Sequence, residues 1–173
     1  MRVQEGGMKM DVLLVKRAQR RDMEAFVELM EKHKTSLYKV AKSYLRSEED
    51  VADVMQETVL SVYEHIGELK NVAYFKTWIT RILMNHCKDL LRQQKRYMVS
   101  DKLPESTDKA PENDREFYRL LGELPEDYRA VFLLYYGEGF RTREIAQILD
   151  MNENTVKSRL RRGRERLKQV LCY

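Results

Sequence analysis

The side chains with the clearest chemistry lie near the C-terminal end of the chain. Between positions 157 and 168 the chain carries seven cationic side chains and a single acidic one, Glu165. The cations are Lys157, Arg159, Arg161, Arg162, Arg164, Arg166 and Lys168. Asn152 and Asn154 stand just before them. Lysine and arginine attract phosphates whatever the sequence and also pair with guanine, while asparagine pairs with adenine. These residue types together indicate contact with DNA.

Two helical patterns and a short turn would position these side chains. The first helix is indicated by Ile145, Ile148 and Leu149, with the small Ala146 allowing a close approach of the second helix. The second helix has an apolar stripe with a glycine on the same face: Val156, Leu160, Gly163, Leu167 and Leu171. Positions 150–153 fit a sharp turn, with Asn152 as an N-cap. The pattern favours a helix-turn-helix, whose second helix lies in the major groove. A helical hairpin with a solvated basic face is the alternative.

A second basic helix is predicted over FKTWITRILMNHCKDLLRQQKR. Its apolar side consists of Phe75, Trp78, Ile79, Ile82, Leu83, Cys87, Leu90 and Leu91. The remaining positions carry Lys76, Arg81, Lys88, Arg92, Lys95 and Arg96, opposed by Asp89. Asn85, Asp89 and Arg92 follow one another at single turns, and we expect them to project opposite Trp78 and Ile82. Cations with a neighbouring amide suit single-stranded nucleic acid, and Trp78 is assigned to the core rather than to base stacking.

An acidic counterpart, SEEDVADVMQE, precedes this basic helix. Ser47 can cap a helix whose first turn holds acids, which suits the helix dipole. The predicted buried stripe is Val51, Val54, Met55, Val59 and Val62. Asp53, Gln56 and Glu57 fall off that stripe and share an exposed polar face, which is either a docking surface or simply solvated.

Composition excludes several classes of protein. The chain has 173 residues, of which 35% are charged, and a net charge of +4. No apolar run reaches membrane-spanning length and no signal peptide is visible, so we expect a cytoplasmic protein without membrane insertion. Cys87 and Cys172 are far apart and predict neither a disulfide nor a zinc site. The sequence lacks the clustered carboxylates, base-activated nucleophile or phosphate-binding loop of an enzyme, and it implies no cofactor or metal.

The predicted fold class is all-α, with two small helical domains joined by a flexible linker. Residues 1–10 are aperiodic and are expected to fray, and helices then fill the first domain, 11–97. Prolines, serines and charges predict the linker over 98–113. The second domain, 114–173, is expected to contain four helices. The helix beginning at Pro125 should bury Val131, Phe132, Leu134, Tyr135 and Tyr136 and end at Gly137 and Gly139.

Three motifs, in this order and spacing, resemble the small two-domain sigma factors of bacterial RNA polymerase, the extracytoplasmic-function (ECF) group of the sigma-70 family. EEDVADVMQET (Glu48–Thr58) resembles the segment that docks on the coiled coil of the largest polymerase subunit. The basic helix Phe75–Arg96 resembles the segment that opens DNA and reads the minus-ten element. Leu124–Leu167 resembles the region that reads the minus-thirty-five element. The NENTVK wording is similar to a SigV-like branch.

The resemblance implies a role for each candidate residue. Core polymerase would be bound by Asp50, Asp53, Gln56 and Glu57. The minus-ten element would be bound and melted by Asn71, Lys76, Arg81, Asn85, Lys88, Asp89, Arg92 and Arg96. The minus-thirty-five element would be read by Arg141, Thr142, Asn152, Glu153, Asn154, Thr155, Lys157, Ser158, Arg161 and Arg162. Further partners implied are the polymerase flap region, promoter DNA and an anti-sigma factor, which would be able to hold the protein at the membrane; the free protein would be a monomer.

The sequence departs from the family pattern at three positions. Asp150 stands where the turn usually has glycine, and aspartate tolerates the left-handed backbone better than most residues. Asn154 replaces another frequent glycine and could contribute a base contact. Arg141 replaces a frequent capping serine, which leaves the following helix capped by Thr142 or by nothing.

A conventional helix-turn-helix regulator, which binds an operator on its own, is the alternative function. It would require an effector or dimerisation domain and would leave the basic helix Phe75–Arg96 unexplained. A nucleic-acid enzyme fails for want of catalytic residues. The sequence does not identify the regulon, the inducing signal, the anti-sigma factor or which of Met1 and Met8 starts the protein.

Overall fold

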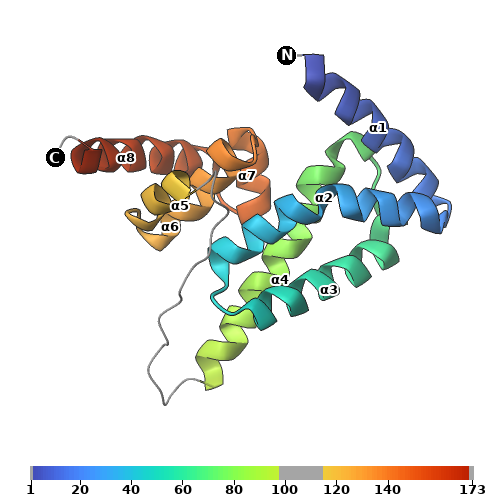
Figure 1. Cartoon of the computed structure of the whole chain (residues 1–173), viewed down its shortest axis with the longest axis horizontal. Coiled ribbons are helices and arrows are strands. Elements are labelled where there is room, and N and C mark those ends of the chain that lie inside the picture. The colour runs from blue at the N-terminus through green and yellow to red at the C-terminus, as the bar shows by residue number, and fades with distance from the viewer. Residues whose placement is uncertain (1, 98–114, 172–173) are drawn as a thin grey trace. The chain divides into compact units, whose positions relative to one another are not determined.

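Helices account for the regular structure in a computed structural model that describes residues 2–97 and 115–171, and no strand occurs within those ranges (Figure 1). The all-α prediction is therefore confirmed. The chain divides into two compact units, 1–94 and 95–173. The predicted linker, 98–113, lies outside the described residues.

The first unit contains four long helices. They are α1 (Arg2–Gln19), α2 (Met23–Tyr44), α3 (Glu48–His65) and α4 (Phe75–Tyr97), with two short 3₁₀ helices, η1 (Ile66–Glu68) and η2 (Val72–Tyr74), between α3 and α4. The expected start of helix at position 11 is wrong, because α1 begins at Arg2. An irregular apolar pattern does not exclude a helical backbone. Gly6 and Gly7 cost about 1 kcal/mol each relative to alanine, which the rest of a long helix can offset.

The helix caps of the first unit follow from the sequence. Ser47 accepts the Asp50 N–H at 3.3 Å to begin α3, as predicted, and Asp22, a cap that was not predicted, accepts the Ala25 N–H at 3.1 Å to begin α2. The large side chains that are most fully buried in this unit are Leu29, Leu37, Ile66, Phe75, Ile79, Leu83 and Met84. Cys87 is also buried, and burial raises the pKa of its thiol to about 12.

The buried stripe of α3 differs from the predicted one. Val51, Val54 and Val62 are buried, but Met55 and Val59 are half-buried. Thr58 lies in the core instead, and its hydroxyl donates to Val54 O at 2.7 Å. A helix buries a threonine at little cost when the hydroxyl bonds to the preceding turn. The stripe therefore runs through position 58, and Met55 and Val59 lie on its flank towards α2.

The second unit contains α5 (Arg115–Gly122), α6 (Glu126–Phe132), a π-helical turn η4 (Leu133–Gly137), α7 (Thr142–Leu149) and α8 (Glu153–Leu171). Pro125 is the N-cap of α6, and Gly139, with φ of 72°, ends the following turn. Tyr136 is 48% exposed, so its predicted burial is wrong. A π turn holds more residues than an α turn, which displaces the periodicity on which that prediction rested.

Among the described residues, no helix is both long and apolar enough to cross a membrane.

Candidate nucleic-acid and partner interfaces

The turn between α7 and α8 is built on backbone geometry that only a few residue types adopt. Asp150 ends α7 in the left-handed region, with φ of 54° and ψ of 55°. The Met151 N–H donates to Ala146 O at 3.0 Å, and the Asn152 carboxamide oxygen accepts the Asn154 N–H at 2.8 Å. Both sequence predictions, an aspartate in the left-handed position and Asn152 as N-cap, are confirmed.

A side-chain network joins the two helices across this turn. Thr142 Oγ1 donates to Glu153 Oε1 at 2.8 Å, and Lys157 Nζ lies 3.0 Å from the same oxygen. The bond from Lys157, and secondly that from Thr142, holds the pKa of Glu153 below its ordinary value. Glu153 therefore remains a carboxylate at neutral pH and holds the ammonium group of Lys157 on α8.

The predicted capping of α7 needs correction. Neither Thr142 nor an empty cap is found: Arg141 is the N-cap, and its backbone N–H donates to Glu144 Oε2 at 2.8 Å. This is the carboxylate half of a capping box, which does not require a serine. Thr142 is thereby free to bond to Glu153.

The leading half of α8 presents a continuous polar face, because Val156, Leu160 and Gly163 are buried. The exposed minus-thirty-five candidates are Arg141, Asn152, Asn154, Thr155, Lys157, Arg161 and Arg162, and the half-buried ones are Thr142, Glu153 and Ser158. Arg159 instead turns towards its own unit, donating to Asp127 O at 3.0 Å. Further along, Arg164 Nη1 donates to Tyr136 Oη at 3.3 Å.

A pocket of about 300 Å³ opens between α3 and α4 in the first unit. It is lined by Ser61, His65, Glu68, Trp78, Ile82, Asn85, His86 and Asp89. Asn85 and Asp89 thus lie on the same side as Trp78 and Ile82, and the predicted opposite placement is wrong. The spacing explains this arrangement, because positions 78, 82, 85 and 89 are separated by steps of four, three and four residues. Trp78 is half-buried rather than a core residue.

Sequence reasoning missed the histidines and the serine of this pocket. Ser61 Oγ lies 2.9 Å from His86 Nε2, and His65 Nδ1 donates to Ser61 O at 2.9 Å. Ser61 and His65 are one turn apart on α3, so their shared face was visible in the sequence, whereas its pairing with His86 was not. An indole, imidazoles, an amide and carboxylates in one pocket suit a planar heterocycle that carries hydrogen-bonding edges.

The other minus-ten candidates lie elsewhere on α4 and in the loop that precedes it. Arg81 and Arg92 are exposed, and Lys76 and Lys88 are half-buried. Arg92 pairs with Asp89 at 3.2 Å. Asn71 is the N-cap of η2, where its Oδ1 accepts the Ala73 N–H at 3.2 Å. The Arg96 side chain lies outside the described part of the chain.

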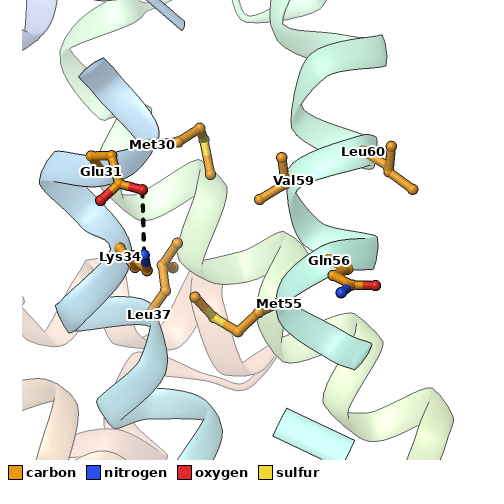
Figure 2. Close-up of a pocket in the computed structure, with 8 residues that line it drawn as sticks. All are labelled: Met30, Glu31, Lys34, Leu37, Met55, Gln56, Val59 and Leu60. Carbon is orange, nitrogen blue, oxygen red and sulfur yellow. Dashed lines mark hydrogen bonds and ion pairs between the residues drawn. The ribbon is translucent and has the colours of Figure 1, made fainter. Parts of the chain in front are cut away.

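The acidic face of α3 adjoins an apolar groove that was not predicted. Asp53, Gln56 and Glu57 are exposed, as expected, while Asp50 is half-buried and accepts a hydrogen bond from Gln94 at 2.9 Å. The groove lies between α2 and α3 and has a volume of about 440 Å³. Figure 2 shows the side chains that line it: Met30, Glu31, Lys34, Leu37, Met55, Gln56, Val59 and Leu60. Leu60 is 57% exposed. Gln56 belongs to both surfaces and links them.

The two units match two family models. Residues 29–97 match sigma-70 region 2, and residues 114–167 match sigma-70 region 4. Over 135 residues the chain is 33% identical to the RNA polymerase sigma factor SigV of Bacillus subtilis, covering 76% of this chain and 81% of SigV. The chain belongs to the sigma-70 family. The family consists of transcription initiation factors rather than enzymes.

Other sigma factors match over greater lengths. The chain is 32% identical to the ECF RNA polymerase sigma factor SigM of Mycobacterium tuberculosis, covering 88% of this chain and 80% of SigM. Within the sigma-70 family the chain belongs to this ECF group. Among solved structures, CnrH in complex with the cytosolic domain of CnrY is 26% identical, with a TM-score of 0.69 and coverage of 94% and 97% of the two chains. RpoE of Bartonella quintana, solved with the anti-sigma factor NepR, shares the fold at 22% identity, a TM-score of 0.68 and coverage of 84% and 96%.

Proposed function

We propose that this ECF sigma factor binds core RNA polymerase through its first unit and reads promoter DNA with both units. The observation that supports the proposal is that one chain carries two different surfaces, each suited to a different form of nucleic acid. The base-sized pocket beside basic α4 suits an unpaired base, while the polar face of α8 suits a duplex groove. An operator-binding regulator needs only the second of these surfaces.

Docking on polymerase is assigned to the α2–α3 groove together with the acidic face of α3. Tight interfaces place an apolar anchor in a pocket and surround it with a polar rim. Here Met30, Leu37 and Val59 line the groove, and Asp53 and Glu57 stand exposed beside it. The fitting partner is a helix with a long apolar side chain and cations beside it, presented by the coiled coil of the largest polymerase subunit.

Promoter opening is assigned to the pocket lined by Trp78 and Asn85. Turning a base out of the stack costs a few kcal/mol, which contacts with the extruded base must offset. Trp78 offers a partly exposed aromatic face and Asn85 an exposed amide. Arg81 and Arg92 are exposed on the same helix and would neutralise the phosphates of the separated strand.

Recognition of the minus-thirty-five element is assigned to the start of α8. Asn152 and Asn154 can pair with adenine, and Lys157 with guanine, each pair being worth about 1–3 kcal/mol of discrimination. Glu153 holds Lys157 in place. The arginines further along α8 supply attraction to phosphates that does not depend on sequence.

A protein inhibitor is a further proposed partner. The related CnrH was solved with the cytosolic domain of CnrY, which supports a similar complex for this chain. The exposed apolar groove also favours a bound protein inhibitor, because apolar surface of this kind commonly marks a protein-binding site.

Run-off transcription of genomic DNA fragments with core polymerase tests the function. Core enzyme supplemented with this protein should start at defined promoters, and core alone should not. A gel shift separates the alternatives, since a sigma factor should bind its promoter with core enzyme and only weakly without it. Tight, specific binding by the isolated protein, with no effect on core polymerase, would contradict the proposal and favour a conventional regulator.

A further inference from the structure

Side chains at the corner between α1 and α2 hold the loop that follows α3. Gln19 Nε2 donates to two backbone carbonyl oxygens, Ile66 O and Leu69 O, both at 2.9 Å. Arg21 Nη1 donates to Tyr63 O at 3.1 Å, and its guanidinium carbon lies 5.0 Å from the centroid of the Tyr63 ring. Helix α1 also contacts both short helices of the loop, η1 and η2, which run beside its C-terminal end (Figure 1).

These donors act where the backbone leaves regular helix: Ile66 O accepts the Leu69 N–H at 3.3 Å within η1, and it accepts the bond from Gln19 in addition. A helix end leaves carbonyl groups without intrahelical partners, and other groups must supply the hydrogen bonds. A carboxamide has two N–H hydrogens, so Gln19 can satisfy both carbonyls at once. Arg21 has φ of 66°, a conformation that a residue with a side chain keeps only where the surroundings fix it. The corner is therefore a rigid support rather than a loose connection.

The supported loop forms one wall of the pocket between α3 and α4. His65 ends α3 and Glu68 ends η1, and both line the pocket, opposite Trp78 and Asn85 of α4. Ile66, whose carbonyl accepts from Gln19, is 2% exposed, so the loop is anchored from within as well. The position of this wall relative to α4 thus depends on bonds made by α1, an element that does not line the pocket.

We infer that Gln19 is a positioning residue for the base pocket, which sets the distance between its loop wall and α4 and thereby the choice of minus-ten base. The inference rests on the proposed function of this pocket. A purely structural role for Gln19 has a different consequence. It would lower the amount of folded protein and reduce transcription from every promoter by the same factor.

The test compares Gln19→Met, which keeps the length of the side chain and removes both donors, with Lys16→Met as a control. Lys16 is exposed on the same helix, one turn earlier. Run-off transcription with core polymerase is measured on a preferred promoter and on the same promoter with the extruded minus-ten base substituted. The ratio of the two yields reports base discrimination and does not change with the folded fraction.

Gln19→Met should lower this ratio about tenfold, as expected when a support is lost and site geometry loosens. Lys16→Met should keep the wild-type ratio, and affinity for core enzyme should be unchanged in both variants. Gln19→Lys retains donors for the two carbonyls, so its discrimination ratio should lie closer to the wild-type value than that of Gln19→Met. An unchanged ratio in Gln19→Met, whatever its total yield, overturns the inference alone. No discrimination by the wild-type protein would overturn the proposed function of the pocket, and this inference with it.

Discussion

The ring of Phe132 occupies the space that a side chain at position 163 would need. A Cβ atom placed on Gly163 would lie 2.3 Å from Phe132 Cε2 and 2.6 Å from Cζ. Phe132 is 3% exposed and belongs to the core that α6 and α8 share. A glycine inside a helix costs about 1 kcal/mol relative to alanine. The close passage of α8 over Phe132 explains why the chain nevertheless carries glycine there.

Gly163→Ala should destabilise the second unit by about 1–3 kcal/mol, because overpacking forces the aromatic ring or the helix to move. Hydrogen exchange of α6 and α8 in the full chain would measure the loss. Gly122→Ala is the matched control, since a Cβ there meets nothing within 4 Å. It should leave stability unchanged within about 0.5 kcal/mol or raise it slightly. Equal changes in stability for the two substitutions would show that the Phe132 ring moves aside without cost.

Asp53 and Glu57 are exposed on α3 and support no core contact, so their charge can be reversed without unfolding the helix. Replacing both with lysine should weaken binding to core polymerase at least about a hundredfold, because unlike charges at the rim become like charges. A pull-down at moderate salt measures binding, and circular dichroism checks helicity. Lysine at Glu116 and Glu123, exposed acids of the second unit, provides the same charge change and should have a much smaller effect. Unchanged binding of the α3 variant would remove this face from the docking surface.

Asn85 and Arg92 are exposed on α4, at and beside the pocket. Their joint replacement by alanine should lower the permanganate reactivity of unpaired thymines about tenfold, because each contributes to holding the separated strand, by base contact or phosphate attraction. Footprints over the minus-thirty-five element should persist, since α8 is untouched. Loss of the upstream footprint together with opening would point instead to misfolding or to a role in docking.

Lys157 and Arg164 lie on the same helix but should affect DNA binding differently. Lys157→Ala or Asn154→Ala should change which bases are preferred in a randomised minus-thirty-five library, by about 1–3 kcal/mol at the contacted position. Arg164→Ala should weaken all promoters about equally and reduce the salt slope by about one. If Arg164→Ala changed the preferred bases and Lys157→Ala did not, α8 would bind DNA in another orientation.

His33 makes the stability of the first unit depend on pH. It is 6% exposed, with Nε2 3.3 Å from a carboxylate oxygen of Asp11 and its ring edge-on to Phe75. Burial holds the pKa of His33 below its ordinary 6.5, and the cations Lys76 and Lys32 act in the same direction while Asp11 opposes them. The unfolded chain therefore takes up this proton at a higher pH than the folded one does.

The contribution of His33 to the free energy of unfolding is fully present above about pH 6.5. It decreases as the pH falls below that value, by at most about 1.4 kcal/mol per pH unit. Urea unfolding followed by Trp78 fluorescence at about pH 7.5 and about pH 5.5 measures the effect. His33→Gln should lose less stability between the two pH values than the wild type does. An equal loss in both proteins would assign the pH dependence to other groups.

The features that could be predicted from the sequence are those that depend on local spacing or on a single residue type. The α7–α8 turn followed from the short interval and the capping amide of Asn152, and the exposed face of Asp53 followed from its place off the apolar stripe. Trp78 shows that residue type alone is a poor guide to burial, because it was assigned to the core as a large apolar residue. Its spacing of seven residues from Asn85 already placed both side chains on one face of the helix. The roles of these residues in binding remain predictions.

Contacts between segments far apart in the sequence could not be predicted. Nothing in the spacing of Gln19 indicates that its amide meets carbonyls at positions 66 and 69, because such contacts depend on how helices cross. The α2–α3 groove was missed for the same reason. Met55 and Val59 fit a buried stripe when α3 is considered alone, and only the distance to α2 leaves them half-exposed.

The buried thiol of Cys87 makes the protein convenient for fluorescence work. A thiol reacts with maleimide dyes as its thiolate, and with a pKa of about 12 Cys87 yields almost none at neutral pH. Replacing Cys172 with serine and adding one surface cysteine to each unit would therefore allow a donor–acceptor pair to be attached while Cys87 stays in place. Energy transfer within single molecules could then follow the separation of the two units as polymerase and promoter are added.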